Sequence, residues 1–220
     1  MPTHKATRSS VDAPAAVLNA WAALKQLGAR YDLAALMPPE PGYAAQAVAA
    51  QGRPAWRALR TWCLAGSSPL QSRLTVAVLE GGDAGVAHTL AQALCLERDG
   101  SLQMLACRGA AGRIALRLKT KAHDLSPWRE RQPGDAWDAG FLPGTAAGLQ
   151  ALARFEPRRA TLLVAQGLST PALRATCALL QSRQRDYGHA LRLLLVPAAP
   201  GLEMGTPVTR IRLEGSARDV

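Results

Sequence analysis

A glycine-rich turn between two apolar segments holds the residues of this sequence that could do chemistry. The apolar run 74–79 enters a turn that contains Gly81, Gly82 and Gly85, and an apolar pattern with helical spacing follows over 86–97. A strand, a glycine turn and a helix in this order bring backbone N–H groups and a helix N-terminus around a phosphate group. The expected chemistry is therefore phosphate binding by the backbone.

Read from Gly82, the turn resembles the P-loop pattern GxxxxGK[ST] of the P-loop NTPase superfamily. Ala87 stands where that family has its second glycine and His88 where it has lysine, while Thr89 keeps the hydroxyl that coordinates Mg²⁺. The lysine places a fixed positive charge on the β- and γ-phosphates, whereas histidine is shorter and mostly neutral at pH 7. The resemblance implies ATP or GTP with Mg²⁺ as cofactor, bound weakly or not at all. The implied binding residues are Gly82, Asp83, Ala84, Gly85, Val86, Ala87, His88 and Thr89.

A second element of that family is an acidic residue at the end of a later apolar strand, which binds Mg²⁺ through water. Here the apolar run 161–165 ends in Gln166, and a neutral amide cannot hold the metal as a carboxylate would. The run 191–196 stands where the family has its next strand. The combination resembles a degenerate member of the AAA+ or signal-transduction ATPase branches, and it implies a P-loop fold without catalytic residues.

Two other interpretations of the glycine turn stay open. Read from Gly81, it resembles the GxxxGxG turn of short-chain dehydrogenases, again with Ala87 in place of a glycine. That family also uses a YxxxK pair, but Tyr187 is followed at the lysine position by Leu191. Arg108 is the residue that could meet the 2′-phosphate of NADP. In the remaining interpretation the glycines only pack a helix against a sheet and bind no ligand.

The order of apolar segments predicts the fold class. Apolar strands without strict alternation, separated by helices, are typical of a parallel sheet covered on both faces. We therefore predict an α/β fold, a three-layer sandwich with a mostly parallel central sheet. The runs 74–79, 161–165 and 191–196 should be central, and the alternating run 208–213 should be an edge strand. Further strands are predicted at 102–107 and 114–119, and helices at 86–97, 145–154 and 170–186.

The chain divides into three predicted parts. Residues 1–11 are polar and predicted to be a disordered tail, residues 12–68 form a helical lead-in, and residues 69–220 form the P-loop-like α/β domain. The lead-in contains predicted helices from Asp12 to Gly28, over 43–50 and from Pro54 onward. Its tryptophans lie at helical spacing, which favours packing over base stacking; they are Trp21, Trp56 and Trp62.

Composition limits the partners. The chain of 220 residues carries 26 Lys and Arg against 16 Asp and Glu, a net charge of +10. Nucleic acid is an alternative partner on this charge, but the arginines are scattered, which is typical of a solvated surface, so it is not favoured. No apolar run reaches a membrane span or an N-terminal signal, so a cytoplasmic protein is expected. Four separated cysteines without a CxxC pair predict buried free thiols and no metal site; they are Cys63, Cys95, Cys107 and Cys177.

A segment rich in tryptophan and charge, 128–140, is predicted to be a loop that covers a sheet edge. Its Asp135 or Asp138 could supply the carboxylate that Gln166 lacks, and Arg158 and Arg159 are interpreted as solvated.

As a whole, the sequence predicts a pseudo-NTPase that acts as a scaffold or regulatory subunit for a protein partner. The alternatives are a nucleic-acid-binding accessory protein of DNA repair or replication and an NAD(P)-binding protein.

Overall fold

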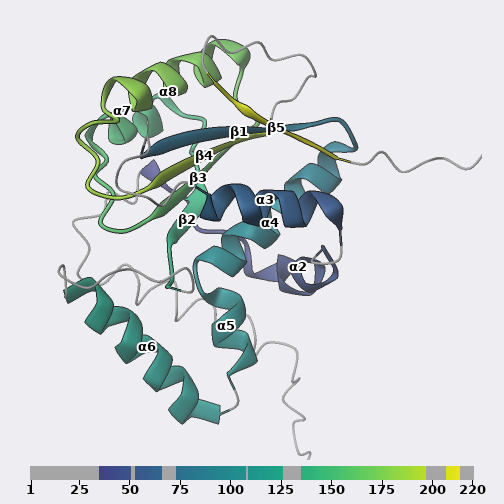
Figure 1. The fold of residues 1–220 in the computed structure, drawn as a ribbon, viewed down its shortest axis with the longest axis vertical. Coiled ribbons are helices and arrows are strands. Elements are labelled where there is room, and N and C mark those ends of the chain that lie inside the picture. The colour runs from purple at the N-terminus through teal and green to yellow at the C-terminus, as the bar shows by residue number, and fades with distance from the viewer. Residues whose placement is uncertain are drawn as a thin grey trace, which may run out of the picture.

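The computed structural model describes residues 35–50, 53–65, 73–107, 109–125, 135–196 and 207–213. These residues form an α/β fold around a five-stranded sheet in which every pairing is parallel and the order is β2-β3-β4-β1-β5 (Figure 1). This confirms the predicted fold class. The strands are β1 (Leu74–Glu80), β2 (Asp138–Phe141), β3 (Thr161–Gln166), β4 (Leu191–Val196) and β5 (Thr209–Arg212).

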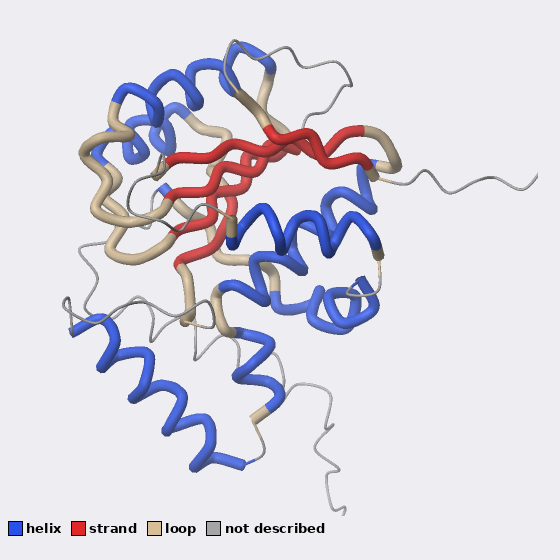
Figure 2. Tube along the Cα trace, viewed as in Figure 1, coloured by secondary structure: helices blue, strands red, loops and turns tan. Residues whose placement is uncertain are grey.

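Helices cover both faces of the sheet, as Figures 1 and 2 show. Successive side chains of a strand point to opposite faces, so Leu162 and Val164 pack into one core cluster and Leu163 and Ala165 into the other. One face carries η2 (Pro41–Tyr43), α2 (Ala44–Ala50), α3 (Pro54–Leu64) and α4 (Ala84–Arg98), and the opposite face carries α7 (Ala146–Arg154) and α8 (Thr170–Ser182).

The strands predicted to be central are central. β3, β4 and β1 lie side by side in the middle of the sheet, and β4 is buried along its whole length. Strands covered on both faces need continuous apolar runs, which is the pattern the sequence shows there. β5 lies at the edge, and within it Ile211 alone is buried, which confirms the predicted half-exposed edge strand.

Two predicted strands are wrong. Residues 102–107 fall mostly in α5 (Ser101–Ala106) and residues 114–119 lie inside α6 (Gly109–Leu125). Short apolar runs do not distinguish strand from helix, and these two are rich in Leu, Ala, Met, Arg and Lys, which favour helices. Figure 2 shows α6 as a helix set apart from the sheet.

One strand was missed. β2 has the sequence DAGF and lies in the segment that was predicted to be a loop. Asp and Gly are depleted in strands, so no local pattern indicates it. The glycine has a tertiary reason: a Cβ on Gly140 would lie 2.2 Å from the carbonyl oxygen of Met37, which forms an isolated antiparallel bridge to Phe141.

Arg192 of β4 attaches α3 to the sheet. Its guanidinium is fully buried and donates hydrogen bonds to the carbonyl oxygens of Cys63 (3.2 Å) and Ala65 (2.6 Å) at the end of that helix. The last carbonyls of a helix have no partners within the helix, so this arginine satisfies the buried Cys63 carbonyl, which would otherwise be unpaired, and binds the chain just after the helix at Ala65. The contact holds the helix that carries Trp56 and Trp62, both buried, which confirms the prediction that these two pack.

Two further predictions concern composition, and a third falls on residues that the structure does not describe. The four cysteines are free; three are buried, and Cys107 is half-buried. Burial raises the pKa of the Cys63 thiol to about 12 and that of Cys177 to about 11, so both thiols are protonated at neutral pH. Among the described residues, no helix is long and apolar enough to cross a membrane. The predicted helix from Asp12 to Gly28 lies outside the described residues.

Candidate functional site

The connection from β1 to α4 is short. β1 ends at Glu80 and α4 begins at Ala84, so the glycine turn consists of Gly81, Gly82 and Asp83. Both glycines have positive φ angles, +75° and +71°, a backbone conformation that side chains disfavour. The later part of the predicted phosphate-binding segment is therefore the first turn and a half of a helix.

Asp83 caps that helix. Its Oδ1 accepts hydrogen bonds from the backbone N–H groups of Gly85 (2.7 Å) and Val86 (3.2 Å), and its carbonyl oxygen accepts one from Ala87 (3.0 Å). A Cβ on Gly85 would lie 2.8 Å from the same Oδ1, so a glycine at this position leaves room for the cap. The carboxylate thus occupies the N–H groups that a phosphate at a helix N-terminus would use.

The C-terminal strand packs against the glycine turn. The N–H of Leu213, the residue after β5, donates to the carbonyl oxygen of Glu80 at 2.8 Å. A Cβ on Gly82 would lie 2.8 Å from the Cβ of Leu213, closer than side-chain atoms approach one another. The absence of a side chain at Gly82 is therefore explained by its neighbour Leu213. The sequence offers no signal for this contact, because 131 positions separate the two residues.

His88 and Gln166 touch each other. His88 Nδ1 lies 2.8 Å from Gln166 Oε1, and both side chains are half-buried. The Tyr43 ring meets the imidazole edge-on with its centroid 5.0 Å away, and the Phe141 ring lies 6.0 Å away. Helix α4, the end of β3, η2 and the end of β2 thus converge at the carboxyl edge of the sheet. His88 and Gln166 are the two residues that stand at the lysine and acid positions of the P-loop pattern.

The contact decides what His88 can offer a ligand. An amide oxygen only accepts, so Nδ1 carries the proton in this contact, and a neutral ring then presents Nε2 as an acceptor. Phosphate oxygens are acceptors too, so a neutral His88 has no free donor for them. The Thr89 hydroxyl donates to the carbonyl oxygen of Gly85 at 2.8 Å. No group of three potential metal ligands occurs among the described side chains.

The predicted phosphate-binding residues thus lie together, but as a helix start and not as a loop. α-Helical hydrogen bonding occupies the N–H groups from Ala87 onward, and Asp83 occupies those of Gly85 and Val86. The arrangement does not fit a nucleoside triphosphate well, because the negative side chain of Asp83 stands where the phosphates would be. Binding by residues 82–89 stays a prediction. Tyr43 and Phe141, which also meet at this edge, were missed because no motif marks them.

Asp138 does not complete a metal site. It is the first residue of β2, pairs with Thr161 at the start of β3, and so lies at the opposite edge of the sheet from Gln166. It is buried and binds Arg158, with Arg158 Nε at 2.8 Å, and Arg159 Nε lies 3.5 Å away. The interpretation of both arginines as solvated is wrong: Arg159 is 2% exposed, and Arg158 is half-buried and paired with Asp138.

Tyr187, the tyrosine of the dehydrogenase interpretation, lies away from the glycine turn. Tyr187 is buried in the core cluster on the α7 and α8 face, whereas α4 packs in the other cluster. Burial raises the pKa of the Tyr187 phenol, the reverse of what an activated catalytic tyrosine needs. Arg108 lies outside the described residues.

The fold and the site define an α/β domain with an all-parallel sheet whose carboxyl edge carries a capped glycine turn and a histidine–glutamine contact. Comparisons of this chain with protein families, with curated protein sequences and with solved structures find no match.

Proposed function

We propose that this chain is a pseudo-NTPase: a P-loop-like domain that does not turn over nucleotide and acts as a scaffold or regulatory subunit for a protein partner. The observation that carries the proposal is the hydrogen bond between His88 and Gln166. A hydrolysing P-loop site needs a lysine and a carboxylate at these two positions, one for the phosphates and one for Mg²⁺. Here the two replacements bind each other.

The strand order supports a relationship to P-loop proteins. β4 lies between β1, which enters the glycine turn, and β3, which ends at Gln166. The resemblance places the family's next strand at residues 191–196, and this run forms β4, which pairs with both β1 and β3. A common architecture does not imply a common activity, so the altered residues decide the function.

Asp83 supports weak or absent binding of ATP or GTP. A phosphate at the start of α4 would lie near its carboxylate, which already accepts two backbone hydrogen bonds. Two like unit charges about 4 Å apart repel by about 1 kcal/mol in bulk water and by about 4 kcal/mol near a protein surface. Because Asp83 is exposed, the lower figure is the relevant one.

A phosphate-release assay tests the proposal. We expect the full chain with ATP or GTP and Mg²⁺ to release no phosphate above the buffer background. Turnover above that background that disappears in Thr89→Val would contradict the proposal, because Thr89 carries the hydroxyl that a P-loop uses for the metal. Ser169→Ala, which removes a hydroxyl at the start of α8, is the matched control and should leave any genuine turnover unchanged.

A further inference from the structure

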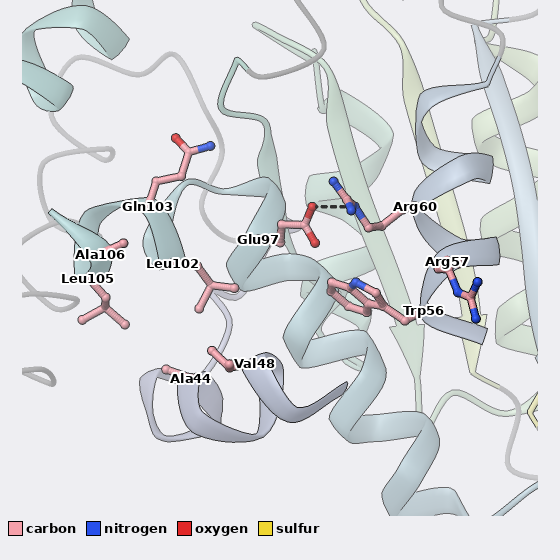
Figure 3. Close-up of a pocket in the computed structure, with 10 residues that line it drawn as sticks. All are labelled: Ala44, Val48, Trp56, Arg57, Arg60, Glu97, Leu102, Gln103, Leu105 and Ala106. Carbon is pink, nitrogen blue, oxygen red and sulfur yellow. Dashed lines mark ion pairs between the residues drawn. The ribbon is translucent and has the colours of Figure 1, made fainter. Parts of the chain in front are cut away.

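A groove of about 780 Å³ lies among four helices on the α2–α4 side of the sheet (Figure 3). Its apolar surface comes from Ala44 and Val48 of α2, from Trp56 of α3, and from Leu102 and Leu105 of α5. Val48 is 62% exposed, on a helix whose buried residues are Ala47 and Ala50. We call this surface the helical groove.

Charged groups surround the apolar surface of the helical groove. Arg60 pairs with Glu97 through Nε and Oε1 at 2.9 Å, and Figure 3 shows this pair above Trp56. Arg57, one turn earlier on α3, also lines the groove, and no carboxylate of the described residues forms an ion pair with it. The groove residues therefore carry a net positive charge, as does the whole chain at +10.

We propose that the helical groove binds an amphipathic helix of the partner protein, with an apolar stripe flanked by acidic residues. The inference rests on the scaffold role proposed above and specifies where and how the partner is held. Exposed aliphatic groups between packed helices suit the i, i+3, i+4, i+7 anchors of a helix laid in a groove. Arg57, which has no described acidic partner, determines which charge the bound helix should carry. Acidic residues beside it would strengthen binding, and basic residues would weaken it.

A second copy of the chain suits the groove less well. The other described helix with exposed large aliphatic side chains is α6, with Ile114 52% and Leu118 65% exposed. That helix also carries Arg113, Arg117 and Lys119, so inserting it would bring like charges against Arg57 and Arg60. Charge complementarity therefore favours a foreign acidic helix.

Two synthetic helical peptides test this proposal with the full chain. Both have leucines at the i, i+3, i+4, i+7 spacing; one is flanked by glutamates and the other by lysines, and both carry a fluorophore for anisotropy. The acidic peptide should bind at least about tenfold more tightly than the basic one. Val48→Glu should weaken its binding about tenfold, and Arg57→Glu should remove the preference for the acidic peptide. Leu118→Glu, an equally exposed leucine on α6, is the matched control and should change nothing.

Equal binding of the two peptides, or acidic-peptide binding that Val48→Glu leaves unchanged, would overturn the proposal. So would a dimer in sedimentation that Val48→Glu dissociates, since the occupant would then be a second copy. The paired substitution Leu18→Glu and Trp21→Glu tests the predicted helix 12–28 as occupant. If it strengthens peptide binding tenfold or more, the groove is filled by the chain itself. These results leave the phosphate-release assay untouched, so the two proposals fail separately.

Discussion

The glycine turn and the helical groove differ in whether their polar and apolar groups already have partners within the fold. The glycine turn has a recognisable motif, yet Asp83 caps its helix and Leu213 fills the space above Gly82. The helical groove has no motif, yet it leaves Val48 exposed and Arg57 without a described acidic partner. A motif therefore reports how the backbone is built, whereas a binding site depends on which groups the fold leaves open.

The substitution with the largest expected effect should disrupt the helical groove and leave the glycine turn intact. Arg192→Met removes the donors that bind the carbonyl oxygens of Cys63 and Ala65. Losing two hydrogen bonds from a charged donor, one of them to a buried acceptor, costs about 3 kcal/mol of unfolding free energy. Urea unfolding measures the loss, and Arg192→Lys, which keeps a charged donor, should lose less. A loss below about 1 kcal/mol in the methionine variant would show that α3 is not held by this contact.

A smaller effect tests whether the glycines of the turn are structural. Gly82→Ala places a Cβ 2.8 Å from that of Leu213 at a φ of +71°. Left-handed backbone alone costs an L-residue about 1–2 kcal/mol, so we expect a loss of about 2 kcal/mol in urea unfolding. Gly42→Ala is the matched control, since nothing lies within 4 Å of its added Cβ. Equal stability of the two variants would contradict a structural role.

Two substitutions of Asp83 separate its hydrogen bonding as the helix cap from its negative charge. Asp83→Ala removes the acceptor for Gly85 and Val86 and should cost about 1 kcal/mol in thermal or urea unfolding. Asp83→Asn keeps an acceptor at the N-cap and should be close to neutral, because Asn and Asp cap about equally well. If alanine is as stable as asparagine, the carboxylate does not act as the cap.

The smallest expected effect is a pH dependence beside the groove. Burial raises the pKa of the Cys63 thiol on α3 from 9.0 to about 12, so the folded chain keeps a proton that the unfolded chain loses. The contribution of this thiol to stability is present below pH 9 and is lost as pH rises from 9 toward 12. At pH 9 the loss is still below about 1 kcal/mol. Urea unfolding at several pH values gives the unfolding free energy as a function of pH. Above pH 9 this free energy should fall less steeply with pH in Cys63→Ala than in the unaltered chain, and an equally steep fall would contradict this assignment.

Much of the fold could be predicted because β1, β3 and β4 are buried on both faces and therefore carry continuous apolar runs. β2 could not, because its DAGF sequence is set by tertiary contacts: Asp138 binds Arg158, and Gly140 admits the Met37 carbonyl. The helical character of α5 and α6 was missed because their apolar runs were read by hydropathy, without weighing their strong helix formers.

The candidate site was predicted residue by residue and not as a geometry. His88 and Gln166 each stood out as departures from a pattern, but their contact depends on the strand order, which no local spacing reveals. Asp83 and Thr89 were identified as ligand-facing, and their actual partners are backbone groups of the same helix. The helical groove has no sequence signal, because its walls come from four separate helices.

Titration calorimetry with pyrophosphate tests the central claim most directly, namely that the glycine turn is closed to phosphate by the carboxylate of Asp83. We predict only weak binding by the full chain, with a dissociation constant on the order of millimolar or above. Asp83→Asn, which keeps the cap and removes the charge, should bind about fivefold more tightly than the unaltered chain, as the removal of about 1 kcal/mol of repulsion requires. Stoichiometric, micromolar binding to the unaltered chain that Asp83→Asn leaves unchanged would contradict the account.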